Sequence, residues 1–238
     1  MPASWKALYE SQAQGLWALI VVPALFLVAL AVRGGARGGG VAPFAARFVR
    51  AWAVAFALES VLDPIATGPL GWPLVPFVLL GDFRVFALVL VVAQPGRARV
   101  GALLEAALWT CLVPAFAYPL HRAIEHVHGP APETILWLLY EVAFAVLAIS
   151  LAVLLVPVRV GPDRPTVRRY LYEVLAYVAV YYALWAIADV VVLTGRDWGW
   201  GLRIVPNLLY YGGFVPLAYW RFFAARYARS SSSTQASR

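Results

Sequence analysis

Charge and cysteine are scarce in this chain, and their scarcity excludes several classes of protein. Only 13% of its 238 residues are charged, while 63% are hydrophobic. Soluble domains are close to half apolar, so this composition is typical of an integral membrane protein. The single cysteine, Cys111, cannot form a disulfide within the chain. The net charge of +7 accompanies no soluble basic domain, so nucleic acid is not expected as a partner.

Lysine and the common active-site motifs are missing as well. The only lysine, Lys6, precedes the first apolar run, so no lysine is present in a seventh helix to bind retinal as in rhodopsins. No GxSxG, Walker, HExxH or dinucleotide-binding motif occurs. His121, His126, His128 and Glu125 lie close together in sequence without a nearby cysteine, and we expect no metal site there. The sequence therefore predicts no catalytic residue, metal or cofactor, and an enzyme is the less favoured interpretation.

Long apolar stretches are abundant, and each is long enough to cross a hydrocarbon core of roughly 30 Å. They predict an all-α, multi-pass protein of the cell membrane, with lipid as its surroundings. The seven predicted transmembrane helices cover residues 15–32, 48–66, 74–93, 100–119, 135–157, 170–193 and 202–223.

Arginines occur in every second connection between these helices, and this alternation predicts the orientation. The connections around residues 33–50, 97–99 and 159–169 and the stretch after 220 are rich in arginine. The connections around Asp63, residues 121–133 and the Arg196–Asp197 pair are close to neutral. Because short cytoplasmic loops retain basic residues, the N-terminus is predicted outside and the C-terminus inside. Residues 225–238 are expected to form a disordered cytoplasmic tail.

Two parts of the chain resemble each other in sequence. Residues 65–83 and 193–214 share Thr-Gly, Gly-Trp and Val-Pro pairs, and WKALYE from Trp5 is similar to WLLYE from Trp137. We therefore predict two three-helix repeats, residues 1–94 and 133–224, joined by a linker helix and an outer loop within 95–132. Four crossings separate the first helices of the two repeats, so the repeats are parallel.

This 3+1+3 layout resembles that of the SWEET and PQ-loop transporters, which are two three-helix bundles around a linker helix. The resemblance implies a transporter fold. It concerns the layout alone, because the chain contains no Pro-Gln dipeptide. No site residue is carried over from that family.

Residues shared by the two repeats are interpreted as structural. Asp63 and Asp189 are predicted to be loop or interface acids, and Pro76 and Pro206 to lie in the first turns of helices three and seven. Water is expected to reach the remaining acids near helix ends, which are Glu105, Glu141 and Glu173.

Charges present only in the first repeat carry the site prediction. Glu59, Asp82 and Arg84 fall near the middle of predicted helices two and three, where an unpaired charge is costly. Asp82 and Arg84 are two residues apart and point in different directions, so Arg84 is predicted to pair with Glu59 and Asp82 to face the bundle interior. Aromatic and amide residues of helices six and seven could form the opposite wall. The predicted substrate-binding residues are Glu59, Asp82, Arg84, Tyr181, Trp185, Asn207 and Tyr211.

Three hypotheses about function follow from this arrangement. The first is a small-solute or proton-linked transporter with a polar midplane site between two helix bundles, which requires a small-molecule ligand. The second is a non-catalytic membrane subunit or ligand sensor, and a subunit requires a membrane-protein partner. The third is a membrane-embedded enzyme acting on a lipid or polyprenyl substrate with Glu59 and Asp82 as acid and base.

Overall fold

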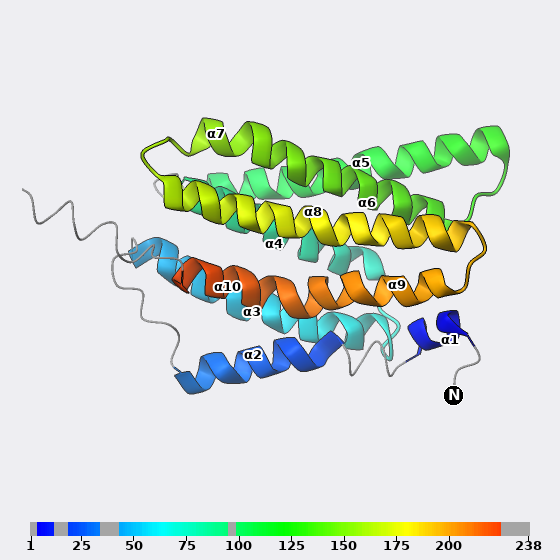
Figure 1. Ribbon diagram of the computed structural model, residues 1–238, viewed down its shortest axis with the longest axis horizontal. Coiled ribbons are helices and arrows are strands. Elements are labelled where there is room, and N and C mark those ends of the chain that lie inside the picture. Colours follow the sequence, from blue (N-terminus) through cyan, green and yellow to red (C-terminus); the bar gives the residue numbers. More distant parts are fainter. Residues whose placement is uncertain (1–3, 12–18, 34–42, 95–98, 225–238) are drawn as a thin grey trace, which may run out of the picture.

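The computed structural model describes residues 4–11, 19–33, 43–94 and 99–224, and within these ranges it is helical without strands. Figure 1 shows that the helices run back and forth along the long axis of the molecule. The predicted cytoplasmic tail, 225–238, lies outside the described ranges. The elements, of which η2 and η3 are π-helical, are α1 (Trp5–Tyr9), α2 (Leu19–Arg33), α3 (Pro43–Thr67), α4 (Leu74–Ala93), α5 (Arg99–His128), α6 (Glu133–Ser150), η2 (Leu151–Leu155), α7 (Val156–Arg159), α8 (Pro165–Leu193), α9 (Trp198–Asn207), η3 (Leu208–Gly213) and α10 (Phe214–Ala224).

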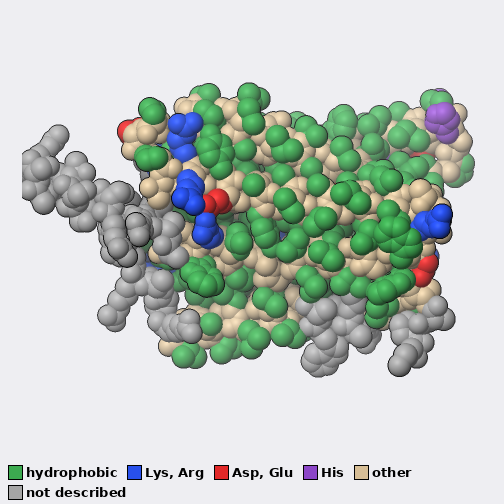
Figure 2. Space-filling model, viewed as in Figure 1, with side chains coloured by type: hydrophobic (Ala, Val, Ile, Leu, Met, Phe, Trp, Pro, Cys, Tyr) green, Lys and Arg blue, Asp and Glu red, His purple; other side chains and the backbone are tan. Residues whose placement is uncertain are grey.

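Four helical segments of the described chain are long and apolar enough to cross a membrane. They are α4, nearly all of α5, the continuous rod from α6 through α7, and α8. On α5, Leu104, Leu108 and Leu112 follow one another at one-turn spacing and are all exposed. Hydrophobic side chains also cover much of the face in Figure 2, while most of the Lys and Arg side chains visible there gather toward one end. The chain is therefore a candidate multi-pass helical membrane protein that contacts lipid.

The end of α5 corrects a sequence prediction. The helix was expected to end near Pro119, with residues 121–133 forming an outer loop, but it continues to His128. The residues after Pro119 include several good helix formers and no glycine before Gly129, so nothing local stops the helix earlier. Gly129 has a φ of 84°, a conformation that glycine adopts without steric cost. The outer connection is consequently short.

The last rod of the structure also begins earlier than predicted. α9 starts at Trp198 rather than near Leu202, so Pro206 lies inside the helix and not in its first turn. Pro206 has no backbone N–H to donate to the carbonyl of Leu202. The chain then continues into the π-helix η3, a rare conformation that is frequent at functional sites. Pro76, in contrast, lies in the first turn of α4 as predicted.

Packing of the helices follows their order in the chain. Each long helix contacts its neighbours in sequence, and η3 and α10 return to pack against α2 and α3. α4 additionally contacts α8 across the middle of the bundle. From Val85 to Ala93 α4 is buried and apolar, and the rings of its Phe86 and of Phe144 on α6 lie 5.4 Å apart. This half of the bundle is a packed apolar core, whereas the half nearer α1 contains the polar residues and the cavity described next.

Candidate functional site

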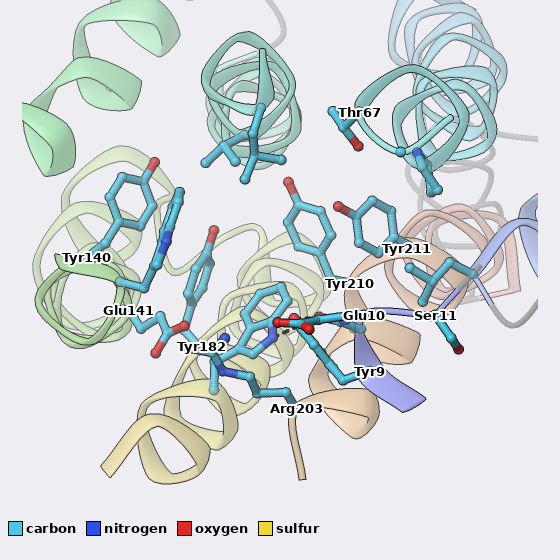
Figure 3. Close-up of a pocket in the computed structure, with 18 of the residues that line it drawn as sticks. Tyr9, Glu10, Ser11, Thr67, Tyr140, Glu141, Tyr182, Arg203, Tyr210 and Tyr211 are labelled. Carbon is cyan, nitrogen blue, oxygen red and sulfur yellow. Dashed lines mark hydrogen bonds between the residues drawn. The ribbon is translucent and has the colours of Figure 1, made fainter. Parts of the chain in front are cut away.

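A cavity of about 640 Å³ lies at the end of the bundle where α1 sits. Its walls come from the C-terminal end of α3, the N-terminal halves of α4 and α6, the second half of α8, α9 and η3. Leu19 of α2 and residues 9–11 also line it. This volume is in the range of pockets that bind small molecules. Figure 3 shows Tyr140, Glu141 and Tyr182 on one side of the cavity and Tyr211 and Ser11 on the other.

Aromatic side chains supply much of the cavity wall. Trp185 of α8 lies between the rings of Tyr182 and Tyr210, with centroid separations of 5.5 and 5.3 Å. Its indole Nε1 donates a 2.9 Å hydrogen bond to Oδ1 of Asn207, which fixes the ring against α9. Tyr211 follows Tyr210 in η3, and both line the cavity. The wall therefore combines aromatic ring surfaces with tyrosine hydroxyls and a few charged and amide groups.

Beneath the cavity lies a group that we name the Arg84 cluster: Glu59, Ser60 and Arg84, with the backbone carbonyl of Tyr210. Arg84 is 0% exposed, and its Nη1 is 3.3 Å from Oε2 of Glu59 and 2.9 Å from Oγ of Ser60. Its Nη2 donates to the Tyr210 carbonyl at 2.8 Å, and its guanidinium carbon lies 4.1 Å from the centre of the Tyr210 ring. The predicted Glu59–Arg84 ion pair is confirmed. Because Tyr210 belongs to η3, the cluster also anchors the π-helix.

Asp82 is held by a separate set of contacts. The hydroxyls of Tyr140 on α6 and Tyr182 on α8 each donate a hydrogen bond to one oxygen of its carboxylate. Asp82 is 0% exposed, so the prediction that it faces the bundle interior is confirmed. Both tyrosines line the cavity. The carboxylate is therefore one hydrogen bond away from the space that a ligand would occupy.

Asp63 forms a third contact at this depth and differs from its prediction. It was expected in a loop or interface, but it lies inside α3 and is buried. Tyr211 donates to its Oδ2 at 2.8 Å, and Thr67 donates to its backbone carbonyl at 2.8 Å. Buried acids require such donors, and a helix interior supplies them only from side chains. The bonds from Tyr140, Tyr182 and Tyr211 all join the second predicted repeat to the first.

A second charged group, which we name the Arg203 cluster, contains Glu141, Asp189 and Arg203. Nε of Arg203 donates to Oδ1 of Asp189, and the guanidinium lies 4.7 Å from the centre of the Trp200 ring. Oε2 of Glu141 is buried without a hydrogen-bond partner. Glu141 and Arg203 both line the cavity. Asp189 is 0% exposed within α8, so it is not the predicted loop acid.

Glu141 also corrects the sequence interpretation. It was expected near a helix end within reach of water, but it lies in the third turn of α6 and is only 7% exposed. The helix begins at Glu133, two residues before the apolar run, and this earlier start shifts Glu141 deeper into the bundle.

The structure separates the seven predicted binding residues into two layers. Trp185, Asn207 and Tyr211 line the cavity. The other four lie beneath it and do not line it; Tyr181 among them is fully buried, and its hydroxyl has no hydrogen-bond partner. Sequence reasoning missed several lining residues or gave them no site role, namely Tyr9, Tyr140, Glu141 and Arg203. Tyr182 and Tyr210, expected among the aromatic residues of the opposite wall, do line the cavity.

One sequence signal could have located part of this set. The two similar stretches WKALYE and WLLYE end in Tyr9-Glu10 and Tyr140-Glu141. All four of these residues line the cavity. Arg203 had no comparable signal, because the interpretation of residues 193–214 rested on their glycines and tryptophans.

No protein-family model, curated protein or solved structure matches this chain. Within the described ranges, no group of three or more His, Cys, Asp and Glu side chains is placed to hold a metal ion. The molecule is a candidate multi-pass helical membrane protein with a solute-sized, aromatic cavity beside buried charges.

Proposed function

We propose that this protein is a proton-linked carrier of a small solute, with seven membrane crossings, and that the solute binds in the cavity beside α1. The observation that carries this proposal is the floor of the cavity. Tyr140 and Tyr182 reach from the second predicted repeat to Asp82 in the first. A carrier must make and break contacts between its two halves around a central site, and hydrogen bonds of this kind are suited to that task.

The seven proposed crossings are the four long apolar segments and three further helical rods. These are α2, α3 and the rod from α9 through α10, which pack alongside the others. α3 is less apolar because it carries Glu59 and Asp63, but both side chains are buried in the bundle and not exposed to lipid. The parallel repeats remain part of the proposal, supported by the Tyr-Glu pairs of WKALYE and WLLYE at one cavity.

Orientation is tested with reporters. The arginine-rich connections place the cavity end outside and the opposite end in the cytoplasm. A reporter that is active only in the cytoplasm should work when fused after Arg229 and fail when inserted at Gly129, in the short loop at the other end. The reverse result would invert the protein and put the cavity on the cytoplasmic side.

Proton linkage is supported by the balance of buried charges. Among the described residues, five acids are buried, namely Glu59, Asp63, Asp82, Glu141 and Asp189, against the two arginines Arg84 and Arg203. Unpaired charges away from water are costly, so the cluster is most stable when some acids hold protons or a cation is bound. Asp82 accepts its hydrogen bonds from two tyrosines that line the cavity, Tyr140 and Tyr182.

Flux through reconstituted protein tests the carrier directly. Liposomes containing the pH dye pyranine would receive sugars, amino acids, alkylammonium salts and carboxylate salts one at a time. We expect one class to change the internal pH with the wild type but not with Asp82→Asn. Asp163→Asn, at an exposed position between α7 and α8, serves as the matched control and should retain flux. A solute that binds the purified protein without moving across the membrane would contradict the carrier.

A ligand sensor is the second candidate, and the packed half of the bundle favours it. From Val85 to Ala93 α4 is buried without interruption, so the described residues continue as a tight core beneath the charges. A sensor would bind its ligand from one side and need no path through this core. The enzyme hypothesis has less support, because Glu59 and Asp82 do not line the cavity and are both engaged by neighbouring side chains.

A further inference from the structure

The cavity contains one carboxylate that the protein itself leaves unmatched. Among the residues that the structure describes, three charged side chains line the cavity: Glu10, Glu141 and Arg203. Glu10 lies at the rim, 3.9 Å from the ammonium group of Lys6. Arg203 is bonded to Asp189. When these two ion pairs are set aside, the charge of Glu141 remains.

Burial makes this leftover charge significant. Glu141 is 7% exposed, and its Oε2 has no hydrogen-bond donor, although buried carboxylate oxygens are nearly always paired. A buried charged acceptor without a donor is unfavourable, and more so than a neutral polar group in the same position. A ligand in the cavity that carries a hydrogen-bond donor would satisfy this oxygen.

The surroundings of Glu141 favour a particular kind of donor. Figure 3 shows Tyr140 and Tyr182 on the same side of the cavity as Glu141. The ring of Trp185, which also lines the cavity, lies 5.5 Å from the ring of Tyr182. Aromatic faces attract cations, and they also pack against hydrocarbon. Nε of Arg203 donates to Asp189, and Oε2 of Glu141 accepts no hydrogen bond from Arg203 or from any other described side chain.

We infer that the cavity binds a small organic amine, with its protonated primary or secondary ammonium group donating to Glu141 and its apolar portion against the aromatic wall. The inference rests on the proposed function and names the substrate class of the same site. A primary or secondary ammonium fits better than a quaternary one because Oε2 of Glu141 requires an N–H donor. A carboxylate solute would be repelled by the same oxygen.

Three probes of one skeleton test the inference on the full-length purified protein by thermal shift. 2-Phenylethylammonium has a positive charge and N–H donors. Trimethyl(2-phenylethyl)ammonium has the charge but no N–H donor, and 2-phenylethanol has neither the charge nor an N–H donor. We expect saturable stabilisation in the order given, with the first probe binding at least about tenfold more tightly than the alcohol. Equal binding of the ammonium and the alcohol would overturn the inference.

Substitution of Glu141 completes the test. Glu141→Gln should weaken binding of 2-phenylethylammonium by about ten- to a hundredfold, the range for losing a hydrogen bond to a charged group, and leave 2-phenylethanol unaffected. Glu125→Gln removes an acid at the same end of the molecule that is paired with Arg122 and does not line the cavity, so it should change neither. If Glu141→Gln fails to fold, Glu141→Asp is the second variant, because it retains the charge but withdraws the carboxylate. It should weaken binding of 2-phenylethylammonium and leave binding of 2-phenylethanol unchanged. If a folded Glu141 variant binds 2-phenylethylammonium as tightly as the wild type, the inference is wrong.

Failure of this inference and failure of the carrier are distinguishable. Ammonium binding through Glu141 without flux in liposomes would retain the amine site and reject transport. Flux of a sugar or carboxylate that is insensitive to Glu141→Gln would retain transport and reject the amine.

Discussion

Arg84 and Arg203 are both buried in the half of the bundle that contains the cavity, yet their surroundings differ in access to it. Arg84 is 0% exposed and bonds to Glu59, to Ser60 and to a π-helical carbonyl. Arg203 is 9% exposed, lines the cavity and bonds to Asp189. Each guanidinium lies over an aromatic ring. The difference indicates that Arg84 holds helices together, whereas Arg203 shapes the charge that a solute meets.

The largest effect is expected from Arg84→Ala. The substitution strands Glu59 and frees the Tyr210 carbonyl, and breaking a buried pair by removing one partner costs about 3–5 kcal/mol. The free energy of unfolding, measured by titrating detergent-solubilised protein with SDS, should fall by that amount. Adding Glu59→Ala should cost little more, because the first substitution already removes the partnership. Fully additive losses would show that the two side chains act independently.

Arg203→Ala should cost less than Arg84→Ala, about 2 kcal/mol, although it also leaves an acid behind. The reason is that the space vacated by Arg203 opens to the cavity, and water there can hydrate Asp189. The same SDS titration measures it. A loss as large as that of Arg84→Ala would mean that access to the cavity does not distinguish the two arginines.

The sequence predicts the surroundings of Arg84 better than those of Arg203. The Glu59–Arg84 pair was predictable because a guanidinium deep in an apolar helix must find an acid at the same depth, and only one was available on the neighbouring helix. The bounds of α4 were also predictable, since a predominantly apolar stretch of 20 residues follows the proline-glycine turn at residues 68–73. The bounds of such a helix are therefore encoded in the local sequence.

The Arg203 cluster could not be predicted in the same way. Its three members lie on α6, α8 and α9, and the sequence shows no spacing that relates them. Glu141 and Asp189 stand near the ends of apolar runs, where hydropathy alone suggests contact with water. α6 begins only two residues before its run and α8 ends with its run at Leu193, so only the packing of three rods shows that these acids are buried. The same limit hid the continuation of α5 and the interior position of Pro206.

A smaller effect, about 1–2 kcal/mol, is expected where α4 meets the π-helix. A Cβ at Gly81 would collide with the hydroxyl of Tyr210, the residue whose carbonyl binds Arg84. Gly81→Ala should therefore lower the free energy of unfolding by loosening the Arg84 cluster, as measured by the same titration. Adding Tyr210→Phe removes the colliding oxygen and should restore part of the loss. If Tyr210→Phe restores none of the lost free energy of unfolding, the close contact between Gly81 and Tyr210 does not affect the stability of the Arg84 cluster.

The smallest effect on stability concerns α1, which shields Arg203 and not Arg84. α1 is attached to the start of α9 by backbone N–H bonds from Trp5 and Lys6 to Asp197, at 2.7 and 3.2 Å. The Trp5 ring lies against Gly201, where a Cβ would come within 2.7 Å of it.

Gly201→Leu should push α1 away from α9 while changing the free energy of unfolding by less than about 1 kcal/mol, because α1 contains no buried residue and leucine favours a helix more than glycine does. Hydrogen exchange followed by mass spectrometry should show faster exchange in residues 4–11 and unchanged exchange in residues 85–92, which lie beside Arg84 in the packed core. Arg203 loses its neighbour Tyr9 in this variant, so 2-phenylethylammonium should also bind and dissociate faster, with the Arg84 cluster undisturbed. Unaltered exchange in residues 4–11 would show that α1 is held by more than its contacts with α9, and equal acceleration in both segments would show that the cavity and the core do not open separately.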